Sequence, residues 1–472
     1  MGRNALVILV LLVTLVTIAS LKAKSALVQT RKTSRNDVYM TAAAVKKSKG
    51  GQATIATSTF NLAKSIVGAG VLSLPSGIAF FADEKAALIP ASIMTLVMGI
   101  VAAYSFSLIG KSCEQHEATS FQDAWAKSVN PKTAWVISGG ITAMCFLASL
   151  AYSIIIGDSF SSLASTFKLQ GFLSHRNNII LSITAAVLLP LCSLKSLNSL
   201  APFSLLGLGG TLYTAIVMGM RYYDGTYAAG GKFFASLAAN AKPSFNTRGG
   251  FAVNHLAFVL LSMLSTSYIA HYNAPQFYNE LKDTSMPRFN KVILGAFGLS
   301  IALFIFMMGI GFLTFGGATA GFVLNNYSGT DGLITFARLA IGLALLTGYP
   351  FTFSALRDGI LDLRKVSGEA REKAFKPLTY GLLALVTALA LTLKDVGFVV
   401  SVSGALFGNA LMFMVPAWMN ICNKKTIAAQ TKVPIDKNGK LEIAFNYGMI
   451  VSGFIMGAVG VTISTLKQLG KL

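Results

Sequence analysis

Charged residues are scarce in this chain: Asp, Glu, Lys and Arg make up 12% of its 472 residues. Soluble globular domains carry roughly 25% charged residues. The hydrophobic share is 54%, and long apolar runs recur from one end to the other without an intervening polar domain. The composition therefore predicts a single multi-pass, all-α membrane domain embedded in the lipid bilayer.

Cysteine and histidine are also few, with four of each. The cysteines are too widely spaced for a CxxC pair or a disulfide framework, and the histidines have no metal-ligand spacing. No apolar run pairs a nucleophile with a base, and there is no soluble catalytic segment. We therefore expect no enzyme activity, no cofactor and no metal site.

Acidic residues are outnumbered 18 to 39 by Lys and Arg. Nucleic-acid binding is rejected because the basic residues lie in short loops between apolar runs and do not form one basic face. With the start of the first core span placed in the cytosol, 18 later loop cations fall on the cytosolic side and 10 on the other. This bias agrees with the positive-inside rule.

A spanning helix needs about 20 apolar residues. On that criterion the sequence predicts eleven core spans, at residues 60–80, 86–110, 133–157, 178–194, 200–219, 251–270, 292–315, 332–353, 377–393, 396–421 and 446–466. We assign residues 55–466 to one transmembrane transporter domain and 467–472 to a C-terminal tail.

The N-terminus permits two interpretations. Residues 1–21 contain an apolar run after Arg3 that resembles a signal peptide, and residues 22–54 form a basic flexible tail. The run is either a signal anchor that leaves the tail in the cytosol, or the first part of a leader whose second part is a plastid transit peptide. The corresponding locations are an endomembrane such as the vacuole, the plasma membrane, or the plastid envelope.

Gly68-Ala69-Gly70, followed by Pro75, lies in the middle of the first span. Glycine permits unusual backbone conformations, and proline removes a helix hydrogen bond. A helix interrupted at membrane depth can bind a carboxylate at its new N-terminus and a cation at the carbonyls of the other half. Close helix packing is the alternative for these small residues, as it is for Gly404 and Gly408.

A second interruption is predicted in the 251–270 span. Ser262, Ser265, Thr266 and Ser267 cluster there, just before residues 271–275 (His-Tyr-Asn-Ala-Pro). Hydroxyl groups bonded back to their own helix are the alternative explanation. Breaks in spans 1 and 6 indicate two inverted repeats of five helices, with the eleventh span additional.

Two cations fall inside predicted spans. Lys64 lies just ahead of the first break, either with its ammonium extended toward the headgroups or as a functional cation beside the site. For Arg338, extension toward the headgroups or a pair with Asp331 is the favoured hypothesis.

Six segments resemble, in order, the amino acid/auxin permease family, which includes sodium-coupled neutral amino acid transporters. They cover the chain from about residue 55 to 466. They are FNLAKSIVGAGVLSLP from Phe60, YSIIIGD from Tyr152, AHYNAPQFYNEL from Ala270, LTFGG with LNNYS from Leu313 to Ser328, YPFTFSALRDG from Tyr349, and SGALFGNA from Ser403.

The resemblance implies a LeuT-like fold of five plus five inverted-repeat helices with an eleventh, and secondary active transport of neutral amino acids by alternating access. Na⁺ or H⁺ would be the coupling ion. Substrate would bind at Gly68, Ala69 and Gly70, with help from Ser262, Ser265 and Tyr152. An amino-acid-sensing receptor or a channel built on the same fold is the alternative.

One departure from the family concerns the coupling ion. Sodium-coupled members have Asn where this chain has Lys64, and their eighth-helix Thr is displaced here by one position, to Thr347. A fixed ammonium would replace the sodium charge. We therefore expect H⁺-linked transport, with Lys64 and Thr347 as the ion-coupling candidates.

Overall fold

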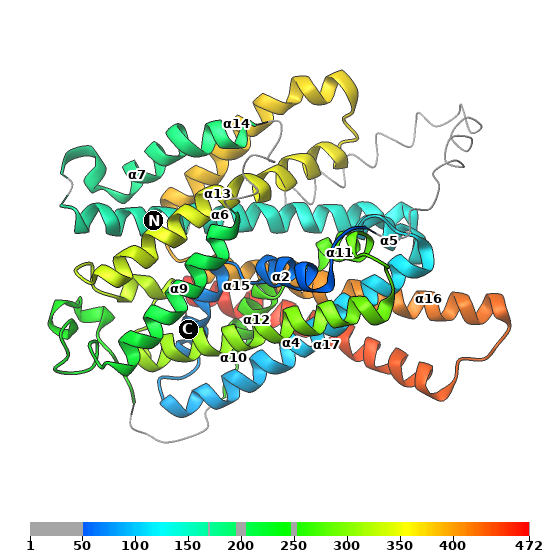
Figure 1. Cartoon of the computed structure of the whole chain (residues 1–472), viewed down its shortest axis with the longest axis horizontal. Helices are drawn as coiled ribbons and strands as arrows, with labels where there is room; N and C mark the ends of the chain where they lie inside the picture. Colours follow the sequence, from blue (N-terminus) through cyan, green and yellow to red (C-terminus); the bar gives the residue numbers. More distant parts are fainter. Residues whose placement is uncertain (1–50, 169, 195–203, 247–252, 472) are drawn as a thin grey trace.

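The computed structural model describes residues 51–168, 170–194, 204–246 and 253–471. Both N-terminal hypotheses concern a leader that lies almost wholly outside these residues, and they remain predictions. The described chain is helical, and its helices run roughly along one long axis so that the loops gather at two ends (Figure 1).

Seven helical stretches are long and apolar enough to cross a membrane by length and composition. The bent pair Ile55–Ile66 and Gly70–Ala79 makes eight. The all-helical, multi-pass class is thereby confirmed. The seven stretches are Lys85–His116, Pro131–Thr166, Met286–Phe315, Gly332–Leu363, Gly368–Thr392, Val396–Thr431 and Lys437–Gln468.

The other three predicted spans are also helical, but they do not meet the test for a single continuous span among the described residues. The fourth is a short stretch, α7 (Arg176–Ile183) with α8 (Leu189–Cys192) after one π-helical turn. The fifth is α9 (Ser204–Tyr223). The sixth is divided between α10 (Ala257–Ser267) and α11 (Ala274–Glu280), which explains why no single helix there reaches spanning length.

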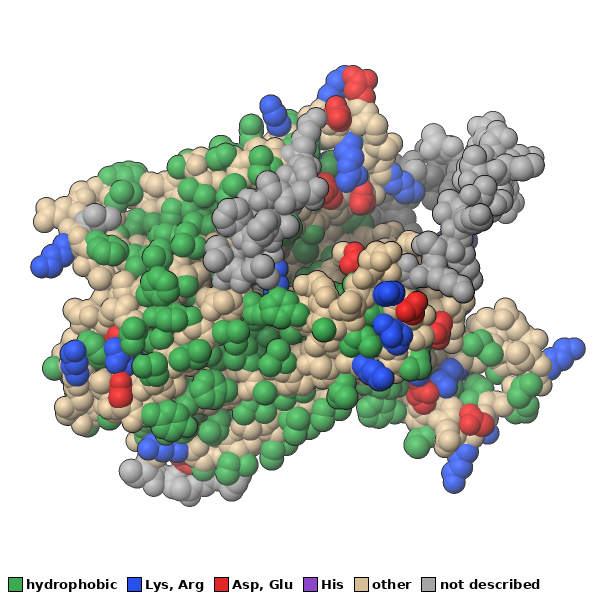
Figure 2. Space-filling view, viewed as in Figure 1, with side chains coloured by type: hydrophobic (Ala, Val, Ile, Leu, Met, Phe, Trp, Pro, Cys, Tyr) green, Lys and Arg blue, Asp and Glu red, His purple; other side chains and the backbone are tan. Residues whose placement is uncertain are grey.

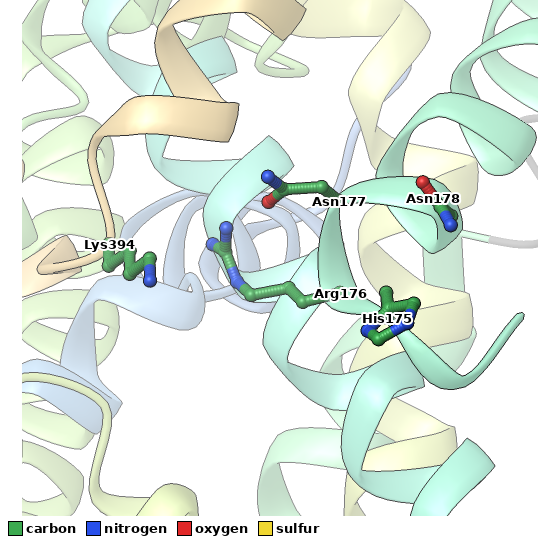
Figure 3. Close-up of a pocket in the computed structure, with 5 residues that line it drawn as sticks. All are labelled: His175, Arg176, Asn177, Asn178 and Lys394. Atoms are coloured by element: carbon green, nitrogen blue, oxygen red, sulfur yellow. The ribbon is translucent and has the colours of Figure 1, made fainter. Parts of the chain in front are cut away.

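The exterior agrees with a membrane environment. Hydrophobic side chains cover the middle of the face shown in Figure 2, while Lys, Arg, Asp and Glu gather toward the two ends. Large apolar side chains on the outside include Ile93, Leu294 and Phe454, all more than half exposed. Such a surface is unfavourable in water and favourable in hydrocarbon.

The first predicted break is present. Helix α2 (Ile55–Ile66) ends before Gly68, the 3₁₀ helix η1 (Ala69–Ser73) follows, and α3 (Leu74–Ala79) continues from it. The two halves of the span are bent by 43°. Both pack against α12 (Met286–Phe315).

The second predicted break is present as well. After α10 the chain leaves the helix at Tyr268, and the 3₁₀ helix η9 (His271–Asn273) leads into α11. Helix α10 packs against α3 and against the tenth span, which begins with α15 (Val396–Ser403). The two broken spans therefore meet in the middle of the bundle.

Small residues bring the helices around α10 close together. A Cβ at Gly404 would collide with the backbone carbonyl of Ser262, and one at Gly408 would lie 3.1 Å from the Ser265 carbonyl carbon. Across the same region a Cβ at Gly460 of α17 (Lys437–Gln468) would meet the Ser262 hydroxyl. The packing interpretation of Gly404 and Gly408 is thus confirmed.

The remaining long helices form the outer framework of the bundle. They are α4 (Leu88–His116), α6 (Ala134–Thr166), α13 (Gly332–Leu363), α14 (Gly368–Thr392) and α16 (Val415–Thr431). Helix α6 lies along α13 over much of its length. Helix α5 (Phe121–Ser128), α11 and the α16–α17 hairpin lie at the same end of the molecule (Figure 1).

Candidate substrate site between two broken helices

The backbone at the first break leaves polar groups without helical partners. The Val67 N–H still reaches the Ala63 carbonyl at 2.8 Å, and the Gly68 N–H turns to the Ile66 carbonyl at 2.9 Å. Ala69 and Gly70 then start a new helix, whose first N–H groups have no acceptor within it. A helix C-terminus, which is partly negative, and a helix N-terminus, which is partly positive, thus meet inside one span.

Gly68 borders open space. Its φ of −102° and ψ of −176° are accessible to any residue, so backbone strain does not require glycine there. A Cβ at Gly68, however, would meet no atom of another segment within 4 Å. Since close packing would fill this position, the space beside the break fits a bound ligand better than the packing alternative.

The second break supplies a hydroxyl to the first. A Cβ at Gly70 would lie 3.4 Å from the Ser267 Oγ, at the last position of α10. The Ser267 Oγ donates to the Met263 carbonyl at 2.9 Å and keeps its lone pairs for other donors. The two interruptions therefore adjoin one another through Gly70 and Ser267.

Two tyrosines lie close to each other at the second break. Tyr152 of α6 and Tyr272 of η9 lie close to each other and to Cys145, which precedes Tyr152 by two turns on the same face of α6. Both tyrosines keep some exposed surface, although each packs against the hydrophobic core. Cys145 is buried. The second break is therefore bordered by aromatic rings and neutral polar groups.

The predicted serines Ser262 and Ser265 face elsewhere. Ser262 is fully buried against Gly404 and Gly460, and its hydroxyl donates to the Phe258 carbonyl at 2.8 Å. The Ser265 Oγ lies 2.6 Å from the Asn409 Oδ1. Neither side chain comes within 4 Å of a Cβ placed at Gly68 or Gly70, so their substrate role stays a prediction that the packing does not favour.

Ser267 and Tyr272 lie at the second break, but the sequence did not identify either as a substrate-binding candidate. Ser267 belongs to the same hydroxyl cluster, but a helix rotates by 100° per residue. Ser267 therefore points about 140° away from Ser262. Composition was sufficient to find the serine cluster, but it could not show which of these serines faces Gly70.

Lys64 occupies the last turn of α2 and is partly buried. A cation there interacts favourably with the free carbonyl groups at the helix C-terminus. The Thr347 hydroxyl, on α13, bonds to the Leu343 and Ala344 carbonyls at 3.0 and 3.1 Å. Its predicted role in ion coupling therefore has no support from these contacts and stays a prediction.

Arg338 corrects one expectation. Its guanidinium is 2% exposed and donates to the Leu324 and Tyr327 carbonyls, each at 2.7 Å. It neither extends to the headgroups nor pairs with Asp331. The loop before α13 turns its carbonyls inward, which gives the buried guanidinium better acceptors.

Asp331 pairs with Arg221 instead. The two carboxylate oxygens accept from Arg221 Nε and Nη2, each at 2.8 Å, and from the Tyr227 hydroxyl at 3.0 Å. Burial and the neighbouring carboxylate raise the pKa of Tyr227, which keeps the phenol protonated as a donor. Asp331 also caps α13 through the Leu333 N–H. This network fixes the loop to α9 and α13.

Residues 51–466 match the family described as "Transmembrane amino acid transporter protein". The chain belongs to this family. The resemblance to the amino acid/auxin permeases is thereby confirmed, and a transporter family agrees with the expectation that the chain is not an enzyme. The match covers both broken helices and every residue of the candidate site.

Individual relatives are distant but extensive. "Putative sodium-coupled neutral amino acid transporter 11" of Danio rerio is 24% identical, over 78% of this chain and 79% of the relative. "Vacuolar amino acid transporter 5" of Schizosaccharomyces pombe is 24% identical, over 88% of this chain and 96% of the relative.

Solved structures share the fold. MhsT in complex with L-phenylalanine superposes with a TM-score of 0.55 at 14% identity, over 88% of this chain and 100% of MhsT. The inward-facing conformation of Mhp1 gives a TM-score of 0.52 at 10% identity, over 89% and 92% of the two chains. The chain therefore has the LeuT-like fold that the family resemblance implied.

Proposed function

We propose that this chain is a secondary active transporter that carries neutral amino acids across a membrane by alternating access, with H⁺ as the coupling ion. The observation that carries the proposal is the meeting of the two breaks, where open space at Gly68 adjoins the N-terminus of η1, which begins at Ala69 and Gly70. The N–H groups at a helix N-terminus are suited to an amino acid carboxylate.

The remaining surroundings favour a neutral substrate. Ser267 adjoins Gly70, and Tyr152, Tyr272 and Cys145 lie around the second break; all four side chains lack a formal charge. Lys64, at the end of α2, is the charged side chain nearest along the chain to the break. A substrate with a charged side chain would have to be desolvated there without a dedicated counter-charge, which costs several kcal/mol.

The coupling ion is inferred from Lys64. The carbonyls at the end of a broken first helix are suited to a cation, and in this chain the Lys64 ammonium lies in that helical turn. A second cation in the same place would be repelled. Some relatives are named as sodium-coupled, so Na⁺ coupling is the outcome against which the proposal is tested.

The test uses the full chain reconstituted in liposomes. A counterflow screen with labelled neutral amino acids identifies a substrate without any ion gradient. Uptake of that amino acid is then measured under an imposed pH gradient or an imposed Na⁺ gradient, each with the membrane potential clamped. We expect saturable counterflow and accumulation with the pH gradient alone. Strict Na⁺ dependence would refute the coupling ion, and absence of saturable counterflow would refute the carrier.

The location is inferred separately. Several fungal relatives are named as vacuolar amino acid transporters, which supports an endomembrane of vacuolar type. Imaging of a C-terminal fluorescent fusion tests it against the plasma membrane and the plastid envelope. Mass spectrometry of the mature N-terminus adds an independent result, since an intact Met1 excludes the two-part leader.

A further inference from the structure

His271 lies in the second broken helix and is fully buried. Its Nε2 lies 3.1 Å from the Ala102 carbonyl oxygen and 2.8 Å from the Ser105 Oγ, both on α4. The imidazole thus connects the break in the sixth span to the second span.

These contacts fix which nitrogen carries the proton. A carbonyl oxygen can only accept, so Nε2 must carry the hydrogen that approaches Ala102. The Ser105 hydroxyl itself donates to the Ala102 carbonyl at 3.0 Å, which leaves its lone pairs for Nε2–H. The neutral ring therefore has its bare lone pair on Nδ1.

Nδ1 is buried and has no hydrogen-bond partner among the described residues. An unpaired buried acceptor is unusual and costs free energy, so it calls for a functional explanation. Because the other nitrogen is already occupied as a donor, Nδ1 is the atom of this ring that remains available to bind a proton.

The surroundings supply no counter-charge. The ring packs edge-on against Phe106 and Phe297, with centroids 5.5 and 6.4 Å away. On the neighbouring α5, Lys127 pairs with Asp123 at 2.8 Å, and both side chains are partly exposed.

The other elements that pack against the break do not change this. On α11, Glu280 accepts from Gln276 and the Tyr278 hydroxyl donates to Glu114 of α4. The neighbouring π-helical stretch η12 (Ala410–Met414) contains no titratable side chain. An imidazolium at His271 would therefore be buried without a carboxylate, and this conformation favours the neutral ring.

We propose that His271 is the proton-binding residue of the transport cycle. A proton adds to Nδ1 when the segment Tyr268–Asn273 opens to water, and the ring becomes an imidazolium with two N–H groups. The proton leaves Nδ1 when the segment returns to the buried arrangement on α4, which regenerates the neutral Nε2–H ring.

Coupling follows from the difference between the two states. A ligand shifts a conformational equilibrium only to the extent that it binds one state better than the other. The buried state described above disfavours the proton, and a hydrated state would bind it. The inference rests on the proposed amino acid/H⁺ transport and assigns the proton to a residue other than Lys64.

His271→Gln tests the assignment in liposomes. A glutamine side chain can keep the N–H that donates to Ala102, but it cannot take up a proton at the position of Nδ1. We expect counterflow of the amino acid selected by the screen to persist, and accumulation under a pH gradient, with the accompanying proton flux, to be lost. The matched control is His255→Gln, since His255 is exposed, and it should retain both activities.

The outcomes separate the two proposals. If the wild type shows no counterflow or no response to pH, the proposed function fails before His271 is tested. If the wild type is driven by the pH gradient and His271→Gln is driven equally, the assignment to His271 is overturned.

A spectroscopic measurement keeps the test decisive if His271→Gln does not fold. The chain has four histidines, so replacing His116, His175 and His255 with Gln leaves His271 as a single ¹⁵N-histidine reporter. We expect an Nε2–H tautomer at alkaline pH, and a titration of Nδ1 that shifts when the transported amino acid is added. An Nδ1–H tautomer, or a ring that does not titrate while transport remains driven by pH, would contradict the inference.

Discussion

Gly68 and Gly404 allow the two roles of glycine in this bundle to be separated by the same substitution. In Gly68→Ala the new methyl group would enter open space, with no atom of another segment within 4 Å and a backbone conformation that alanine adopts freely. We expect stability to change by no more than about 0.5 kcal/mol.

Gly404→Ala differs because the methyl group would collide with the Ser262 backbone carbonyl, which cannot rotate away. Overpacking of this kind costs about 3 kcal/mol at the upper end of its usual range. The better helix propensity of alanine returns about 1 kcal/mol. The net loss of about 2 kcal/mol corresponds to a midpoint lower by roughly 2 °C for 472 residues.

The two substitutions should have the opposite order of effects on substrate binding: Gly68→Ala should weaken it and Gly404→Ala should not. The methyl group of Gly68→Ala lies beside the N–H groups of Ala69 and Gly70, where the substrate carboxylate is proposed to bind. Loss of one charge-assisted hydrogen bond costs about 2 kcal/mol, which weakens binding about 30-fold. The folded fraction of Gly404→Ala should bind substrate nearly as the wild type does.

The measurements are the thermal midpoint of the purified protein and the concentration dependence of counterflow. If Gly68→Ala binds substrate normally, the open space at the break is not the carboxylate site. If Gly68→Ala is instead destabilised as strongly as Gly404→Ala, the packing explanation of the first break is restored.

Three further predictions use the same assays. Ser267→Ala should weaken substrate binding several-fold, whereas Ser262→Ala should leave it unchanged, because the Ser262 hydroxyl faces Gly460. The opposite order would show that substrate binds on the Ser262 face of α10, as the sequence predicted. Lys64→Asn should weaken H⁺ driving or introduce Na⁺ dependence, and unchanged ion dependence in uptake assays would reduce Lys64 to a structural cation. Asp331→Asn should lower stability by about 3 kcal/mol, because the Arg221 guanidinium loses its buried partner, and a midpoint equal to that of the wild type would show that the network contributes little.

Much of the architecture could be predicted from the sequence. A scarcity of charge and repeated apolar runs require a membrane environment, because hydrocarbon excludes charged side chains and unpaired backbone groups. Both helix breaks were also predictable, since Gly68 to Gly70 with Pro75, and the serine cluster before Pro275, weaken helices locally. These are properties of short segments, so they can be recognised without knowing what packs against them.

The span count shows where local patterns stop being sufficient. The sequence predicted a sixth span at 251–270 with a break in it, but it did not locate the break: the chain leaves α10 at Tyr268 and resumes as the 3₁₀ helix η9 at His271. Hydropathy measures how apolar a segment is and does not report where its backbone hydrogen bonds end.

Only the tertiary structure decided which side chains meet. Ser262 and Ser267 are equivalent by composition, and the packing of Gly404 and Gly460 against α10 determines that Ser267 is the one beside Gly70. The inward carbonyls of Leu324 and Tyr327 give Arg338 its partners and leave Asp331 to Arg221. Such partnerships depend on how helices distant in sequence rotate about their axes, which the close approach of small residues fixes only when the bundle is assembled.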